Sequence, residues 1–444
     1  MPVGGWLSRR GPSARGDRWA LAVALGLVAT SVLVGAALGW AGRPVHAPAA
    51  PLFGHVLPHL GPGTPLAIAI GLAVIRWGPA IAERLAWRRL LAVAWLSATA
   101  WTFALALVDG WQRGVAGRLT TQFEYLSEVP GVTDIPAMLR GFAGRILADS
   151  SDPWTTHVAG HPPGALLVFV GLDRIGLPGG GWAATFCVLV GCSAVTTVAI
   201  TLRALGDEPA ARVALPFLVL FPGAVWVGVS ADGLFMGVAA AALALLAIGL
   251  SRPSRLAVTL GGLCLALCAY LSYGLVLLVL PAAAVLAMRA RRIGLLVWAG
   301  LGAGLVVAAM TGLGFDWWQG YHLVKQRYYQ GLASQRPYAY WIWANLAALT
   351  LSAGPAAAAT LRHAAARVLT ARTPAVLLGL GAAAAIIAAD LSGLSKAEVE
   401  RIWLPFAIWL PAAASLLPAP DRRGWLSLQA TTALLINHLV LTSW

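Results

Sequence analysis

The chain has 444 residues, of which 59% are hydrophobic and only 11% are charged, and its formal net charge is +14. A soluble domain carries about 25% charged residues, so this composition cannot cover a water-facing surface and indicates an integral membrane protein. The positive charge does not indicate nucleic-acid binding, because the arginines cluster between apolar stretches as the positive-inside rule expects.

The apolar stretches are about 15 to 25 residues long and rich in Ala, Leu, Gly and Val, which is typical of helices that span a bilayer. We therefore expect an all-α, multi-pass protein of the cell membrane with about 13 transmembrane helices and a helical outer loop. The expected spans, one of them in doubt, are 19–41, 64–80, 88–108, 162–177, 181–202, 213–231, 233–250, 256–271, 273–288, 293–313, 341–360, 374–391, 402–418 and 425–442.

Three parts are expected along the chain. Residues 1–87 hold a cytoplasmic tail, which starts with basic residues such as Arg9 and Arg10, and two leading transmembrane helices. The first apolar run is too long for a signal-peptide core, so it predicts an uncleaved helix. Residues 88–410 form the transmembrane core, and residues 411–444 hold the last helices.

The arginine clusters predict which connections face the cytoplasm. These connections are 1–18, 76–90, 203–212, 251–256, 289–292, 361–373 and 419–424. The loops 109–160, 314–340 and 392–401 then face outward. These assignments contain one conflict of parity. The outward loop 109–160 and the cytoplasmic connection 203–212 lie on opposite sides, so an odd number of crossings should separate them, but two apolar stretches lie between them. Either 162–177 is a partial or re-entrant helix, or 203–212 faces outward.

The long outer loop contains a segment with helical periodicity, 133–148. Thr133 or Asp134 is a suitable N-cap, and Pro136 falls in the first turn, where a missing N–H costs nothing. The apolar side chains fall on one face, which predicts a helix that lies on the membrane surface or packs on the protein. The four cysteines lie inside apolar stretches and are expected to be packing residues rather than disulfides.

Three acids mark the start of this loop: Asp109 at a helix end, and Glu124 and Glu128 further on. Glu124 and Glu128 are four residues apart and would share one face of a helix. Carboxylates at the lip of a membrane cavity can act as a general base on a hydroxyl or bind a divalent metal. The simpler interpretation is an ordinary acid in water at a helix end.

Two short motifs and two groups of cations complete the set of candidates. In H-P-P-G, the prolines fix His161 at the start of a helix, either as a donor to substrate or as a bystander. In S-A-D-G, Asp232 lies either in a polar cavity or in an exposed turn. Positive charge on the outer side suggests an anionic ligand such as a lipid phosphate, unless a local acid compensates it. These outer cations are Lys325, Arg327, Arg336 and Arg401.

Taken together, these residues resemble the GT-C class of membrane glycosyltransferases. The resemblance rests on an acid at a helix end before a long outer loop (Asp109), helices within that loop, H-P-P-G, and S-A-D-G-L-F. A narrower resemblance is to actinobacterial multi-pass membrane proteins that share E-Y-L, G-H-P-P-G and E-V-E-R-I-W-L-P-F. The likeness spans about residues 88–410. This chain departs from the class in having Gly110, rather than a second acid, after Asp109, and two helices before it.

The resemblance implies transfer of a sugar from a polyprenyl-phosphate donor to a glycan or lipid acceptor at the outer face. It implies a base at Asp109, with Glu124 or Glu128 as alternates, and substrate contacts from His161, Asp232 and the outer cations. Membrane lipids are the expected surroundings, no nucleic acid is expected, and the need for a divalent metal is open. The competing hypotheses are a transporter or flippase of lipid-linked sugars and a non-catalytic subunit of envelope assembly.

Overall fold

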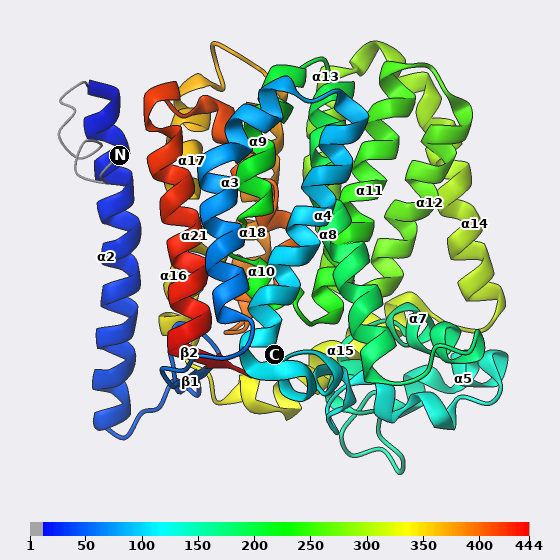
Figure 1. The fold of residues 1–444 in the computed structure, drawn as a ribbon. Helices are drawn as coiled ribbons and strands as arrows, with labels where there is room; N and C mark the ends of the chain where they lie inside the picture. Colours follow the sequence, from blue (N-terminus) through cyan, green and yellow to red (C-terminus); the bar gives the residue numbers. More distant parts are fainter. Residues whose placement is uncertain (1–11, 444) are drawn as a thin grey trace.

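The computed structural model describes residues 12–443, and Arg9 and Arg10 of the expected tail lie outside this range. The described chain is a helical bundle with one short strand pair (Figure 1). The helices are α2 Pro12–Trp40, α3 Thr64–Arg84, α4 Trp87–Ala106, α5 Ile135–Gly141, α6 Thr156–Gly160, α7 Pro163–Arg174, α8 Gly180–Ala204, α9 Glu208–Val219, α10 Ala224–Val227, α11 Ala231–Ser251, α12 Arg255–Leu271, α13 Val279–Met288, α14 Leu296–Gly312, α15 Trp317–Gln330, α16 Tyr338–Ala353, α17 Ala356–Arg367, α18 Pro374–Leu391, α19 Val399–Ile402, α20 Leu404–Ala407 and α21 Arg422–Leu439.

Short 3-10 or π segments connect many of these helices. They are η1 Leu107–Asp109, η2 Gln112–Ala116, η3 Arg118–Thr120, η4 Tyr125–Ser127, η5 Val129–Gly131, η6 Phe142–Arg145, η7 Tyr273–Leu278, η8 Ala290–Leu295, η9 Leu332–Ser334, η10 Pro411–Leu416 and η11 Ala419–Asp421. The two strands, β1 Gly54–Val56 and β2 Val440–Thr442, pair antiparallel and join the α2–α3 connection to the end of the chain.

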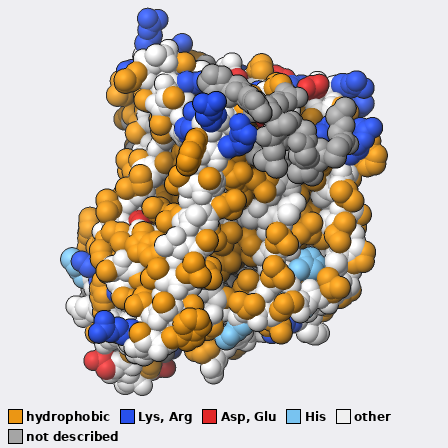
Figure 2. Space-filling model, turned by 90° about the vertical axis from the view of Figure 1, so that its left-hand side faces the viewer, with side chains coloured by type: hydrophobic (Ala, Val, Ile, Leu, Met, Phe, Trp, Pro, Cys, Tyr) orange, Lys and Arg blue, Asp and Glu red, His pale blue; other side chains and the backbone are white. Residues whose placement is uncertain are grey.

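The chain is an all-α, multi-pass membrane protein. Within residues 12–443, seven helices are long and apolar enough to cross a bilayer, and the pair α16–α17 makes an eighth if its 105° bend is counted as one span. The space-filling view shows apolar side chains across the middle of one face, with Lys and Arg gathered mainly toward its upper edge (Figure 2). This apolar band is the surface that lipid chains cover.

Several expected spans are interrupted, which is why the expected number of about 13 is not reached by long helices alone. The stretch 213–231 is divided between α9, which ends at Val219, and the single turn α10, with Pro222 in the break between them. The stretch 402–418 is divided among α19, α20 and η10, with Pro405 and Pro411 at the starts of two of these segments. Proline lacks an N–H and cannot continue a regular helix, so these breaks follow from the sequence.

The connections divide between two ends of the bundle. The arginine end holds the connections at 84–89, 203–212, 252–255, 289–292, 367–373 and 418–423, at the top of Figure 1. The loop end holds the connections at 107–162, 313–338 and 392–398, at the bottom.

Two arginines resolve the conflict of parity. Arg212 donates from Nη1 to the carbonyl oxygens of Ala82 at 2.7 Å and Leu85 at 3.0 Å. The guanidinium of Arg203 lies 4.5 Å from the ring centre of Trp87. The connection 203–212 therefore lies at the same end as the α3–α4 turn. Helix α7 has only 12 residues and stays at the loop end, so it is a partial helix and not a crossing.

The long loop at the loop end, residues 107–162, is packed on the protein. Asp134 caps α5 by accepting from the Ala137 amide at 3.0 Å, as expected, but α5 ends at Gly141, where η6 follows, so the predicted helix 133–148 is too long. Met138, Phe142 and Ile146 on its apolar face are buried in the core. Of the two interpretations of this helix, packing on the protein is the one observed. The four cysteines are free, three of them buried.

The α16–α17 bend depends on one glycine. Gly354 has φ 88° and ψ 153°, a conformation that is nearly restricted to glycine. A Cβ there would also collide with the side chain of Gln429. We expect Gly354→Ala to lower the free energy of unfolding by about 1–3 kcal/mol, measured as a lower midpoint of thermal unfolding in detergent. Gly300→Ala is the control, because Gly300 lies within α14 with open space beside it. Equal midpoints for the two variants would contradict this account of the bend.

The assignment of α7 as a partial helix places Ser151 and Pro209 on opposite sides of the membrane. Both residues are exposed, Ser151 at the loop end and Pro209 at the arginine end. With a membrane-impermeant maleimide on intact cells, we expect only one of Ser151→Cys and Pro209→Cys to be labelled before the membrane is permeabilised. The unaltered chain gives the background. Labelling of both variants from the same side would mean that α7 crosses.

Candidate functional site

A buried group of charged side chains lies at the loop end, centred on Arg401 of α19. Arg401 forms an ion pair with Asp232 at the start of α11 and donates from Nη2 to Glu398 Oε2 at 2.9 Å. The same nitrogen lies 3.3 Å from His157 Nε2 of α6. Because buried charges are tolerated only when paired, these contacts fix three distant segments against one another.

Glu124 extends this group from the long loop 107–162. Its Oε1 lies 2.7 Å from His157 Nδ1. Since a carboxylate only accepts, Nδ1 carries the proton, and the lone pair of Nε2 faces the Arg401 donor. A carboxylate, an imidazole and a guanidinium therefore lie in a row. The carboxylate orients the imidazole, and the guanidinium occupies the nitrogen that could accept a proton.

Arg336 extends the group on the other side. Its Nη1 donates to Glu398 Oε1 at 3.0 Å and to the Lys396 carbonyl at 2.8 Å. Lys396 in turn donates from Nζ to the Arg336 carbonyl at 3.2 Å. Among the described residues, Nε and Nη2 of Arg336 have no hydrogen-bond partner although both are buried. This leaves unused capacity to bind an anion.

We use the name ionic network for five side chains together with Glu398, which lies between the two arginines. The five are Glu124, His157, Asp232, Arg336 and Arg401. The exposed fractions of the five lie between 4% and 7%. Ala397 and Glu398 have φ values of 67° and 63°, which are rare for residues other than glycine. The backbone is therefore strained at these two residues, where it turns the 398–402 segment toward Asp232 and His157.

Charge and burial shift the pKa values of this segment. Burial lowers the pKa of Arg401, but the charges of Asp232 and Glu398 outweigh it and raise that pKa above its usual value. Burial raises the pKa of Glu398, but Arg401 and Arg336 outweigh it, so the net shift is downward. Both groups therefore stay charged at neutral pH. Burial raises the pKa of the neighbouring Glu400 to about 7.

Asp109, the first expected base, lies in a different cluster. It contacts His59 Nε2 at 2.9 Å, Arg118 Nη2 at 3.0 Å and Arg113 Nε at 3.7 Å. Arg118 also donates to the Thr442 carbonyl at 3.1 Å. Asp109 thus joins the start of the long loop to the α2–α3 connection and, through Arg118, to β2.

Glu128 also lies outside the ionic network. The sequence predicted that it shares a helical face with Glu124, and this prediction is wrong. The short segment η4 lies between the two acids, so the α-helical spacing does not apply. Glu128 accepts from the Thr155 amide at 2.9 Å and pairs with Arg145 at 3.4 Å. These contacts hold the loop together internally.

His161 and Asp232 both lie at the ionic network. His161 packs against the rings of Tyr125, His157 and Phe235, with ring centres 5.6–6.5 Å apart. Its Nδ1 bonds the His157 carbonyl at 2.8 Å, and burial lowers its pKa to about 4. Asp232 is buried, so S-A-D-G is not an exposed turn. Ser230 caps α11 by accepting from the Gly233 amide at 3.2 Å.

The remaining cations do not reach the ionic network. Lys325 Nζ lies 5.8 Å from the ring centre of Tyr321, and Arg327 Nη2 lies 3.5 Å from the Trp154 carbonyl. Sequence reasoning missed His157, which stands four residues before His161 in T-H-V-A-G-H. Its only sequence signal was this spacing, which places two histidines near one another on a helical turn.

The sequence did not decide whether the chain needs a divalent metal. Within residues 12–443, no group of three or more His, Cys, Asp or Glu side chains is placed to hold a metal ion. The acids of the ionic network are instead paired with arginine or histidine.

Comparison of the sequence with family models and with curated proteins gives no match. The family, activity and substrate therefore rest on the residues themselves.

The low pKa of His161 predicts a pH dependence of stability. In the unfolded chain a histidine binds a proton near pH 6.5, whereas in the folded chain it does so only near pH 4. The stability due to neutral His161 is thus complete above pH 6.5 and is lost as the pH falls toward 4. Between pH 7 and 4 we expect the free energy of unfolding to fall by about 1–3 kcal/mol more in the wild type than in His161→Phe, measured by thermal unfolding. His322→Phe, at an exposed position, is the control, and parallel curves for wild type and His161→Phe would refute this.

Proposed function

We propose that the chain is a membrane glycosyltransferase of GT-C type, which moves a sugar from a polyprenyl-phosphate donor to a glycan or lipid acceptor of the cell envelope. The observation that carries the proposal is the buried row Glu124–His157–Arg401 under the outer loops. It combines a group able to take a proton with a group able to hold a phosphate. The positive-inside rule assigns the loop end to the outer face.

The proposed reaction uses these groups in order. Once the covering segments open and Arg401 Nη2 moves away from Nε2, His157, oriented by Glu124, accepts the proton of an acceptor hydroxyl at Nε2. The hydroxyl oxygen then forms a bond with the anomeric carbon of the donor, and the bond from that carbon to the phosphate oxygen breaks. Arg401 and Arg336 stabilise the negative charge on the departing polyprenyl phosphate. His161 positions His157, and Asp232 positions Arg401.

This assignment replaces Asp109, the expected base, by His157, with Glu124 as the acid beside it. Glu124 contacts the histidine of the ionic network, whereas Asp109 is engaged by His59 and Arg118. Because the ionic network is buried, the covering segments have to open for substrate, as active-site lids do. Rings near these segments suit sugar stacking. Trp317 and Tyr321 stack with centres 5.5 Å apart, and Trp318 is 67% exposed.

The proposal includes the finer topology of about 13 crossings. It adds to the long helices the bent pair α16–α17, the shorter apolar helices α12, η7–α13 and α20–η10, the broken span α9–α10, and α21. An odd number is supported by the positions of the two ends of the described chain, since α2 begins at the arginine end and β2 lies at the loop end (Figure 1).

The test is transfer of label in nanodiscs, with radiolabelled polyprenyl-phosphate mannose, arabinose or glucose as donor and a cell-envelope extract as acceptor. We expect transfer by the wild type and a loss of at least ~100-fold in Glu124→Gln and His157→Gln, the usual contribution of a general base. Lys325→Gln, outside the ionic network, is the matched control and should keep the wild-type rate. Full activity in Glu124→Gln would contradict the proposal.

A transporter or flippase of lipid-linked sugars is the second candidate. The interrupted segments α9–α10–α11 and α19–α20 favour it, because broken helices whose ends surround a polar site are typical of transporters. Movement of labelled donor across proteoliposomes without chemical transfer would favour this candidate. Neither transfer nor movement would leave the role of a non-catalytic envelope subunit.

A further inference from the structure

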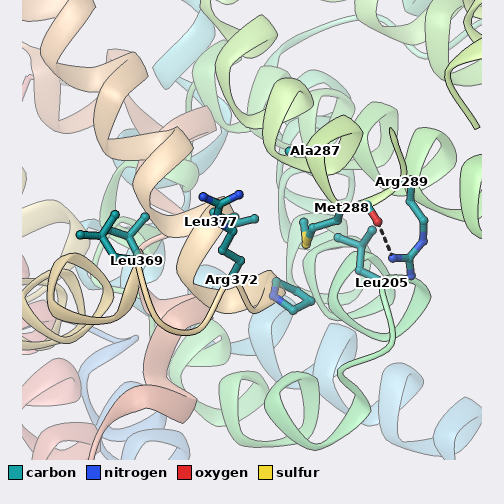
Figure 3. A pocket seen from close by; sticks show the side chains of 9 residues that line it. Leu205, Ala287, Met288, Arg289, Leu369, Arg372 and Leu377 are labelled. Carbon is teal, nitrogen blue, oxygen red and sulfur yellow. Dashed lines mark hydrogen bonds between the residues drawn. The ribbon is translucent and has the colours of Figure 1, made fainter. Parts of the chain in front are cut away.

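A second polar site lies at the arginine end, far from the ionic network. A pocket of about 470 Å³ opens between the ends of α8 and α13 and the connection from α17 to α18 (Figure 3). Its size falls within the range of small-molecule sites, roughly 300–1,000 Å³. It is lined by Leu205, Ala287, Met288, Arg289, Val368, Leu369, Arg372, Pro374 and Leu377.

The charged part of this pocket is entirely positive. Arg289 is held in place by bonds to Ser251 Oγ at 3.0 Å, the Met288 carbonyl at 3.0 Å and the Ala204 carbonyl at 3.3 Å. A guanidinium has five N–H donors, so donors remain after these bonds. Arg372 is exposed and lines the other side (Figure 3). None of the lining residues is an acid.

The helix ends around the pocket add to this charge. Pro374 is the first residue of α18, an 18-residue helix, and it lines the pocket. The start of a helix carries a partial positive charge, which favours an anion. The opposite, negative end of α13 is compensated where Arg289 donates to the Met288 carbonyl. Arg291 and Arg292 follow directly in η8 and are exposed.

The other walls of the pocket are apolar. Leu205, Met288 and Leu377 form them, and Leu369 at the opening is 87% exposed. A free phosphate in water does not need such walls, whereas a phospholipid presents a phosphate and an apolar chain together. The pocket also lies where helices end, the level at which lipid headgroups lie.

We propose that this pocket binds the headgroup of an anionic phospholipid, with Arg289 and Arg372 on the phosphate and Leu369 against the start of an acyl chain. The occupant follows from complementarity of charge and from the apolar wall beside it. The site is independent of the proposed transferase reaction.

The test is native mass spectrometry of the full chain in detergent with phosphatidylglycerol or phosphatidylcholine. We expect phosphatidylglycerol to bind more tightly, and Arg372→Gln to weaken it about fivefold, the effect of one basic residue near anionic lipid. Leu369→Ser should also weaken it. The matched control is Arg255→Gln, at the same end but against Trp298 outside the pocket, and it should bind as the wild type does.

Three results would overturn the proposal. They are equal binding of the two lipids by the wild type, unchanged binding of phosphatidylglycerol by Arg372→Gln, and complete displacement of the lipid by millimolar inorganic phosphate. The last result would assign the pocket to a free anion. Because Arg372 is exposed, its replacement does not disturb the core, and the thermal midpoint of the variant should equal that of the wild type.

Discussion

The loop end of this protein depends on one buried guanidinium. Arg401 pairs with Asp232 and Glu398 and contacts His157, and these residues come from α11, the 398–402 segment and α6. Removing one partner of a buried ion pair costs about 3–5 kcal/mol, because the other charge is left uncompensated. The left-handed residues Ala397 and Glu398, and the breaks on both sides of α19, are the backbone conditions that bring Arg401 to its partners.

From this pairing the arrangement of the long loop 107–162 follows. His157 is fixed between Arg401 and Glu124, so the loop that carries both residues is drawn onto the bundle. The apolar face of α5 and η6 is then buried rather than spread on a membrane surface. The result is a packed cover over charged groups, with Asp109 and Glu128 as anchors at its edges. Such a cover would exclude water from the proposed transfer reaction.

Much of this could be predicted from the sequence. Helix positions, the clustering of arginines at one end, and the polar character of the three outer connections all follow from composition and periodicity. Glu124 was identified as an acid of the long loop, His161 by H-P-P-G, and Asp232 by its place between two apolar stretches. Arg336 and Arg401 were identified because positive charge at that end departs from the positive-inside trend. Their contacts were not predictable, since Arg401 and Asp232 are 169 residues apart and no local spacing reports such a pair. Asp109 was favoured by its place at a helix end, a feature that does not distinguish a base from an anchor. The divided spans were missed because hydropathy does not detect a break inside an apolar stretch, although Pro222 and Pro405 marked two of them.

The most direct test of the central claim is a cryo-electron microscopy structure of the protein in nanodiscs with a non-hydrolysable polyprenyl-phosphate sugar. The account predicts density for the phosphate within hydrogen-bond distance of Arg401 or Arg336, with the sugar beside His157 and the prenyl chain along the apolar helices. Density for the phosphate at Asp109 and Arg118, or a fully closed ionic network with the donor bound elsewhere, would contradict it.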